Sequence, residues 1–250
     1  MKQNFKLIVS YDGTRFFGWE HQPNTDMTIQ GKLETVLTRM VGLPENKPVT
    51  VIGAGRTDAG VHARAMTCNV LLDTEMTPEE IQAYMNHYLP EDISVNEVRH
   101  AADRFHSRFN AVGKTYRYTL WYGASKPVFD RKYVTVLDKA PNIDRMREAA
   151  ELMTGTHDYK CFCGNPKMKK STVRTVDTIR IDIQGNYIRL YFHGDGFLQN
   201  MVRIMTGTLI SVGYGEIHPE AIPGIIESKD RKNAGPTAPP QGLCMMKVDY

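Results

Sequence analysis

The sequence predicts an α+β fold built from two ferredoxin-like halves, each with the element order βαββαβ. Three observations lead to this prediction. Alternating apolar residues mark short strands, capped helical patterns lie between them, and the order of the first half recurs in the second. Two such halves predict a continuous, mainly antiparallel sheet with a central cleft lined by basic residues. We place the halves at residues 1–103 and 104–250.

The first half has four expected strands and two expected helices. The strands are expected at 5–9, 49–52, 66–72 and 93–98. The first helix is expected over 28–41, with Thr28 as its N-cap and Gly42 after its last turn. The second helix follows a capping box formed by Thr77 and Glu80, and it ends before a proline at position 90.

The second half repeats this order with one extra helix. Its strands are expected at 114–122, 173–183, 187–192 and 243–248. Its helices are expected at 142–154, 197–212 and 220–227. A Gln-Gly-Asn turn at 184–186 joins the two middle strands into a hairpin. The last strand is expected to close the second half.

The distribution of charge indicates a type of binding partner, and the cysteines indicate a cellular compartment. The net charge is only +3, but basic residues dominate two stretches, 99–117 and 160–180, which suits a polyanionic partner. The alternative is a pair of solvated basic loops. Four cysteines form no disulfide framework, and His157 with Cys161 and Cys163 lacks a second ligand pair for zinc. We therefore expect reduced thiols, a cytoplasmic location and no metal, and no apolar run predicts a membrane span.

The most informative stretch is GAGRTDAGVHARA, which runs from Gly53 to Ala65 between two expected strands. A hairpin turn requires only a Gly or Asn pair, whereas this one also carries arginine, aspartate and histidine. The aspartate could serve only as a turn residue that caps nearby backbone N–H groups. The glycines match neither of the common phosphate-binding fingerprints.

The segment GRTDAGVHA, 55–63, resembles the signature of the TruA family of tRNA pseudouridine synthases, and the resemblance continues along nearly the whole chain. The other matching segments are YDGT at 11–14, GW at 18–19, TIQGKLE at 28–34, RFHSRFNAVGKTYRY at 104–118, STVRTV at 171–176, GDGFLQNMVRIMTGTL at 194–209 and AGPTAPPQGL at 234–243. An ordered series of this kind is far more specific than the signature alone.

The resemblance implies an isomerase that converts uridine to pseudouridine in RNA. In that reaction the N1–C1′ bond breaks, the base turns, and C5 joins C1′, so neither a metal nor another cofactor is expected. The implied substrate is the anticodon arm of tRNA, at uridines 38, 39 and 40, and the implied assembly is a homodimer. No membrane partner is expected.

The resemblance also implies four site residues. Asp58, in the first half, is the expected nucleophile or base, and Arg203 is expected to pair with it and keep it ionised. Tyr116 is expected to stack on the target base, and Arg56 to fill the space the base leaves or to bind a phosphate. We expect two further histidines, His62 and His193, to have no catalytic role.

Four positions depart from the usual pattern of the family: Glu20, His21, Met66 and Asn69. None of them is an implied catalytic residue, so they bear on the choice of RNA rather than on the chemistry. Two alternatives therefore stay open. The chain could be a paralogue that modifies another RNA, or an RNA-binding module without activity, since βαββαβ units also build such modules.

Overall fold

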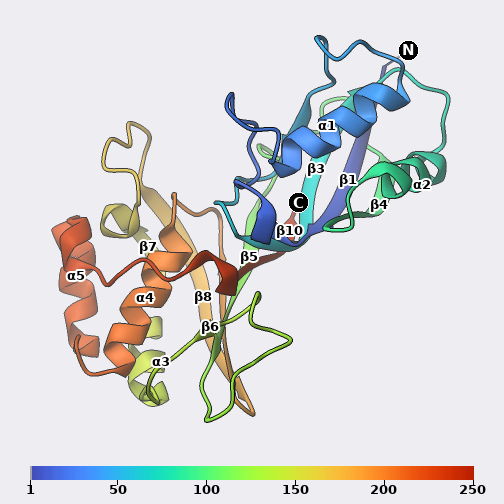
Figure 1. The fold of residues 1–250 in the computed structure, drawn as a ribbon. Coiled ribbons are helices and arrows are strands. Elements are labelled where there is room, and N and C mark those ends of the chain that lie inside the picture. Colours follow the sequence, from blue (N-terminus) through green and yellow to red (C-terminus); the bar gives the residue numbers. More distant parts are fainter. Residues whose placement is uncertain (1) are drawn as a thin grey trace. The chain divides into compact units, whose positions relative to one another are not determined.

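The computed structural model describes residues 2–250, which divide into two compact units. The first unit contains the described residues up to Val112 together with Cys244–Tyr250, and the second is Gly113–Leu243. Each unit combines helices with a mainly antiparallel sheet (Figure 1). The expected α+β class is therefore confirmed.

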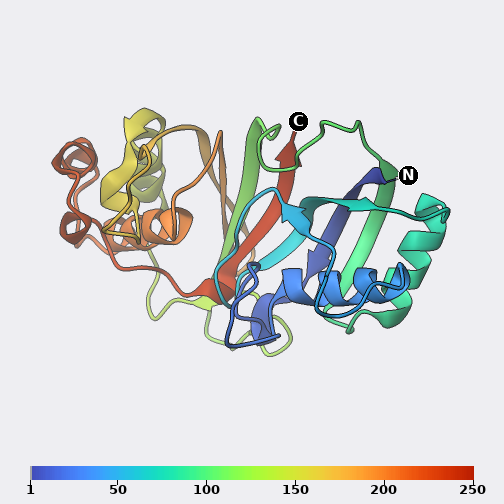
Figure 2. The ribbon, with the colours of Figure 1, turned by 90° about the horizontal axis from the view of Figure 1, so that it is seen from above.

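The first unit follows the expected βαββαβ order. Its elements are β1 (Gln3–Tyr11), α1 (Ile29–Met40), β2 (Val51–Gly53), β3 (His62–Leu72), α2 (Pro78–Tyr88) and β4 (Ile93–His100). The strands lie in the order β4-β1-β3-β10, where β10 is Leu243–Asp249, and β2 pairs with β3. Both helices cover the same face of this sheet (Figure 2).

Side-chain caps start both helices of the first unit. The hydroxyl of Thr28 accepts a hydrogen bond from the backbone N–H of Gly31 at 3.2 Å. At α2 the capping box is complete, because Glu80 N–H donates to the Thr77 hydroxyl and Thr77 N–H donates to the Glu80 carboxylate. Each cap satisfies backbone groups that the first helical turn leaves unpaired, which stabilises a helix by about 1 kcal/mol.

The core of the first unit lies between the sheet and these two helices. Alternate residues of β1, namely Phe5, Leu7 and Val9, are fully buried. Leu33 and Leu37, one helical turn apart on α1, are also fully buried. The period of two in the strand and of about four in the helix bring both apolar faces to the same layer.

The last strand belongs to the first unit, not to the second as expected. β10 pairs with β3 in parallel, with Met245 opposite Ala63, and the Met245 side chain is fully buried. The Tyr250 hydroxyl also donates to the carbonyl of Ser107 at 2.8 Å. These bonds hold the segment before Val112 in the first unit, so the unit extends beyond the expected boundary at residue 103.

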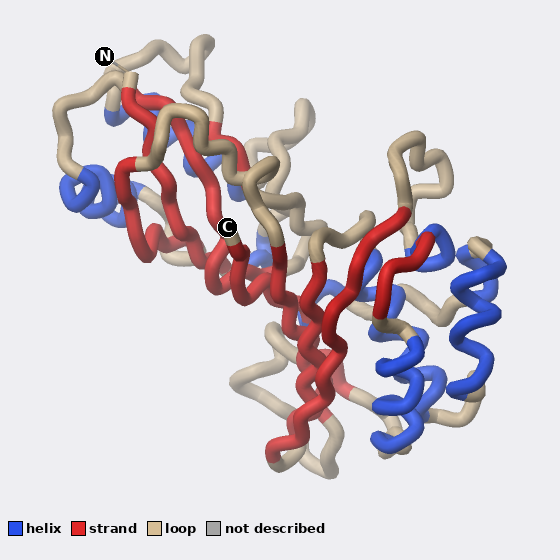
Figure 3. Tube along the Cα trace, turned by 180° about the vertical axis from the view of Figure 1, so that it is seen from behind, coloured by secondary structure: helices blue, strands red, loops and turns tan. Residues whose placement is uncertain are grey.

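The second unit is a sheet with its helices on one face (Figure 3). Its elements are β5 (Gly113–Trp121), β6 (Thr135–Val136), α3 (Ile143–Leu152), β7 (Gly155–Asp158), β8 (Val173–Gln184), β9 (Tyr187–Gly194), α4 (Met201–Gly213) and α5 (Ile222–Ser228). The strands lie in the order β5-β9-β8-β7, and β6 pairs with β5. The short β7 was not expected from the sequence.

The helix α4 begins later than the sequence suggests. It starts at Met201 rather than near Phe197, because Asn200 takes a left-handed conformation with φ of 59° that interrupts the helical path. Beyond that point α4 is almost entirely buried, including Ile204 and Met205. Its apolar surface packs in the core of the second unit.

Close packing on α4 leads to a stability prediction. A Cβ atom on Gly207 would lie 1.7 Å from the backbone oxygen of Pro236, whereas one on Gly224 of α5 would meet nothing within 4 Å. We expect Gly207→Ala to lower the free energy of unfolding by about 3 kcal/mol, because the clash is with backbone. Gly224→Ala should raise it by up to about 1 kcal/mol through helix propensity.

Denaturant unfolding of the two alanine variants measures both effects. Because the substitution is the same and both sites are helical, the opposite signs isolate the contact with Pro236. Equal stabilities for the two variants would contradict the close approach of this segment to α4.

Candidate active site

The glycine-rich signature forms a loop over residues 54–61 between β2 and β3. Because β3 begins at His62, residues 62–65 are part of the strand and not of the expected turn. Glycine is required at position 53, where a Cβ would lie 2.5 Å from the indole ring of Trp19. That ring is only 3% exposed. The backbone that enters the loop therefore packs directly against a buried tryptophan.

Asp58 lies in this loop between two fixed points. The preceding residue, Thr57, is buried, and its hydroxyl is 2.8 Å from the hydroxyl of Tyr11. Two residues later, Gly60 has φ of 77°, and its N–H donates to the carbonyl of Phe16 at 3.2 Å. Asp58 itself is half-buried. These bonds therefore hold the loop backbone on both sides of Asp58.

Arg56 lies in the same loop and is mostly exposed. Its guanidinium forms an ion pair with the carboxylate of Glu20, and the two side chains are 59% and 48% exposed. The sequence indicated Glu20 only as a departure from the family pattern and did not indicate this pairing. Both predicted site residues of the first unit, Arg56 and Asp58, are therefore on one loop.

Tyr116 lies on β5 in the second unit. Its ring is 7% exposed and meets the ring of Phe197 edge to face, with centroids 5.3 Å apart and planes at 86°. Tyr118, two residues along the same strand, is fully buried, and burial raises the pKa of its hydroxyl. That hydroxyl donates to the carbonyl of Pro239 at 2.7 Å. Tyr118 is thus a core residue.

Arg203 lies on the first turn of α4 in the second unit. Its Nε donates to the carbonyl of Ala238 at 2.7 Å, and its Nη1 donates to the Oδ1 of Asn200 at 2.9 Å. The adjacent Val202 and Ile204 are buried, whereas Arg203 is half-buried. These two hydrogen bonds orient the guanidinium plane. The sequence did not indicate that Arg203 would contact Asn200 and Ala238.

The two histidines that are expected to have no catalytic role, His62 and His193, both have polar contacts. The Nδ1 of His62 accepts a hydrogen bond from Gly13 N–H at 3.0 Å and lies 3.2 Å from a carboxylate oxygen of Asp12. In the second unit, the Nδ1 of His193 is 2.8 Å from a carboxylate oxygen of Asp177. Each histidine thus lies beside a carboxylate of its own unit.

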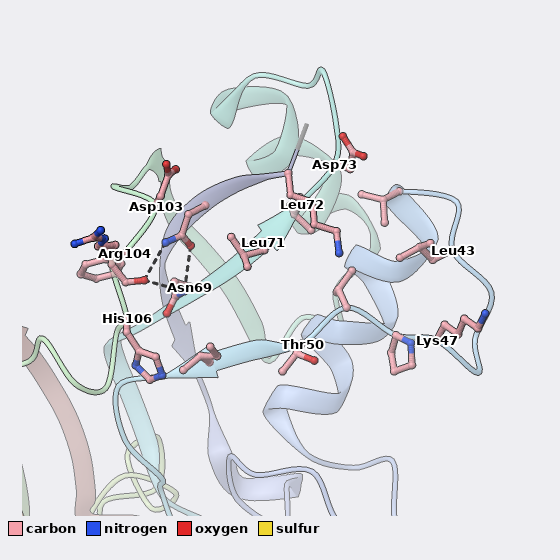
Figure 4. Close-up of a pocket in the computed structure, with 17 residues that line it drawn as sticks. Leu43, Lys47, Thr50, Asn69, Leu71, Leu72, Asp73, Asp103, Arg104 and His106 are labelled. Atoms are coloured by element: carbon pink, nitrogen blue, oxygen red, sulfur yellow. Dashed lines mark hydrogen bonds between the residues drawn. The ribbon is translucent and has the colours of Figure 1, made fainter.

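Two of the unusual residues, Met66 and Asn69, are buried in the first unit. Met66 is a fully buried core side chain. Asn69 lines a cavity of about 710 Å³ and lies beside the segment that carries Arg104 and His106 (Figure 4). Its Nδ2 donates to Oδ1 of Asn4 at 3.1 Å, and its Oδ1 accepts from the N–H of Ser107 at 2.9 Å. Asn69 thus anchors this basic segment.

No metal centre is apparent in the described part of the chain. Within residues 2–250, no group of three or more histidine, cysteine, aspartate or glutamate side chains could hold an ion. Cys161 and Cys163 are buried, and burial raises the pKa of the Cys161 thiol to about 12. Over the same residues, no helix has the length and apolar character needed to span a bilayer.

Comparisons with known proteins agree with the motifs. A family model described as tRNA pseudouridine synthase matches residues 7–110 and 149–250, which is more than half of the chain. The matched ranges contain Arg56, Asp58 and Arg203, whereas Tyr116 lies between them.

Three curated relatives are similar over nearly their full length. The tRNA pseudouridine synthase A of Bacillus sp. (strain KSM-64) is 48% identical over 232 residues, which cover 93% of each chain. The tRNA pseudouridine synthase A of Clostridium acetobutylicum is 42% identical, covering 99% of this chain and 100% of the relative. The tRNA pseudouridine synthase A 2 of Bacillus cereus (strain ATCC 10987 / NRS 248) is 41% identical over 99% of both.

Proposed function

The chain belongs to the tRNA pseudouridine synthase family, and from this premise we propose that it converts uridine to pseudouridine in the anticodon arm of tRNA. The proposed targets are uridines 38, 39 and 40. We further propose, from the family resemblance, that the protein acts as a homodimer in the cytoplasm.

The proposed chemistry centres on the carboxylate of Asp58. The reaction breaks the N1–C1′ bond of uridine and forms a C5–C1′ bond, while C5 loses a proton and N1 gains one. Asp58 acts as nucleophile or base, by attack on C1′, by addition to C6, or by removal of a sugar proton. Each of these roles needs an ionised carboxylate at a fixed position.

The observation that carries this proposal is the anchoring of the loop backbone on both sides of Asp58. The loop is bonded at Thr57 and Gly60, so the backbone on both sides of Asp58 is anchored in the folded first unit. Pre-organisation of this kind lowers the entropic cost of reaching the reactive geometry.

The other predicted residues have roles that fit their surroundings. In this proposal, Arg203 keeps Asp58 ionised, and its two hydrogen bonds within the second unit support a fixed orientation of the guanidinium. Tyr116 stacks on the target base, and Arg56 contacts phosphate or occupies the space that the base leaves. An arginine suits the first role because it stays charged at every working pH.

Exposed basic residues in both units support binding to the RNA backbone. In the first unit, Arg104 and Arg108 are exposed on the segment that Asn69 anchors. In the second unit, Lys169 and Lys170 are exposed. Contacts of this kind with phosphates would position the RNA without reading base identity, which suits an enzyme that acts on several neighbouring uridines.

Mapping pseudouridine in total RNA from cells that lack this protein tests the proposed function. We expect pseudouridine to disappear from positions 38, 39 and 40 of tRNA and to return when the wild-type gene is restored. Loss at sites in another RNA would instead identify the chain as a paralogue with a different substrate. An unchanged map would favour a non-catalytic RNA-binding role.

Replacing Tyr116 tests the stacking role. Loss of one base–aromatic contact is worth about 1–3 kcal/mol, so Tyr116→Ala should lower kcat/KM by roughly 5- to 150-fold. Tyr116→Phe keeps the ring and should retain most of the activity.

Steady-state kinetics on a tRNA transcript measure both Tyr116 variants. Because Tyr116 also packs against Phe197, the stability of each variant is measured alongside. Tyr118→Phe is the matched control, since it removes a buried hydroxyl from the same strand and should lower stability without changing kcat/KM. Full activity of Tyr116→Ala would contradict the stacking role.

A further inference from the structure

Glu20 is held next to the signature loop by backbone contacts. The N–H of Trp19 donates to the carbonyl of Thr57 at 3.0 Å. The backbone of Gly18, with φ of 95°, approaches the same carbonyl so closely that a Cβ would lie 2.6 Å from it. Together with the burial of the Trp19 side chain, these contacts fix the backbone immediately before Glu20. The position of Glu20 is therefore part of the folded first unit.

The carboxylate of Glu20 neutralises the arginine nearest to Asp58 in the sequence. It forms an ion pair with the guanidinium of Arg56, two residues before Asp58. Both side chains remain about half exposed, so RNA could reach either of them. A guanidinium binds carboxylate and phosphate with the same fork of N–H donors. The two anions are therefore alternative partners for Arg56.

We propose that Glu20 competes with an RNA phosphate for the guanidinium of Arg56 and so weakens the affinity of this protein for its RNA. This proposal rests on the proposed function for the identity of the RNA. An exposed ion pair is worth at most about 1 kcal/mol, so a phosphate can displace the carboxylate. Binding of the phosphate therefore costs the ion pair between Glu20 and Arg56 that the free protein keeps. Glu20 thus lowers the affinity of the protein for RNA by the strength of this ion pair.

Binding of an unmodified tRNA transcript to the full-length protein tests the proposal. At low salt, Glu20→Gln should tighten Kd by roughly three- to five-fold, the size expected for one exposed ion pair. The gain should shrink at high salt, because screening weakens the interaction that the substitution removes. In an Arg56→Gln background, the same substitution should give no gain, because the guanidinium for which Glu20 and the phosphate compete is then absent.

A control variant separates this effect from a change in net charge. Asp144 forms an exposed ion pair with Arg147 on α3 of the second unit, outside both basic stretches. Asp144→Asn makes the same change in net charge and should leave Kd unchanged.

Three results would overturn the proposal: no gain from Glu20→Gln, an equal gain from Asp144→Asn, or a gain that persists in the Arg56→Gln background. Pseudouridine formation by the wild-type protein on the same transcript is measured separately. A wild-type protein that binds the transcript but forms no pseudouridine contradicts the proposed function, while the affinities still decide the role of Glu20.

Discussion

Asp58→Asn is expected to reduce pseudouridine formation by at least about 10⁴-fold in kcat, with tRNA affinity changed by no more than a few-fold. The amide has the size of the carboxylate, but it can act neither as a nucleophile nor as a base. The backbone bonds that hold the loop, from Trp19 to Thr57 and from Gly60 to Phe16, do not depend on the carboxylate. Release of tritium from uridine labelled at C5 measures the reaction.

A second carboxylate of the first unit provides the control for this result. Asp26 is exposed and forms an ion pair with Lys32 at 2.9 Å, away from the signature loop in the sequence. Asp26→Asn removes the same charge and should leave turnover at the wild-type level. If Asp58→Asn also turned over at the wild-type rate, the proposed mechanism would be wrong.

Arg203→Gln is expected to lower kcat by roughly 10²- to 10³-fold, the usual effect of losing one pre-organised electrostatic contact. It should also move the acidic limb of the pH–rate profile to higher pH. The sign follows from the proposed mechanism, in which the reaction needs ionised Asp58 and the positive charge of Arg203 favours that form. Loss of this charge would make the carboxylate bind its proton more tightly. Activity should therefore recover in part as the pH is raised.

Two further variants distinguish this electrostatic role from a structural one. Arg203→Lys keeps the charge but loses the fork that reaches Ala238 and Asn200, so kcat should fall while the pH profile stays in place. Arg231 also holds this C-terminal segment, with Nη1 donating to the carbonyl of Gly235 at 2.9 Å. Arg231→Gln should loosen the segment without moving the pH profile. A profile shifted equally by Arg203→Gln and Arg231→Gln would contradict the proposed role.

Local patterns predicted much of the secondary structure. The N-cap of Thr28 and the capping box of Thr77 and Glu80 are where the sequence indicates, because each joins residues three positions apart. The start of α4 was predicted too early, because asparagine tolerates left-handed backbone but its presence does not require it, and Asn200 adopts that conformation. The order of motifs also indicated the family, which the comparisons confirm.

Contacts between distant residues could not be predicted in the same way. The pairing of β10 with β3 joins Met245 to Ala63, and an apolar strand pattern indicates burial but not which strand lies alongside. The bonds of Asn69 with Asn4 and Ser107 likewise depend on which strands and segments become neighbours.

The sequence by itself determined the helix caps, the α+β class, the family and the candidate residues Arg56, Asp58, Tyr116 and Arg203. Only the tertiary structure decided that Glu20 pairs with Arg56, that Ala238 and Asn200 hold Arg203, and that the last strand joins the first unit. The physical reason is the range of the interactions. Caps and apolar periods act within a few residues, whereas ion pairs and strand pairing join groups that only the completed fold brings within bonding distance.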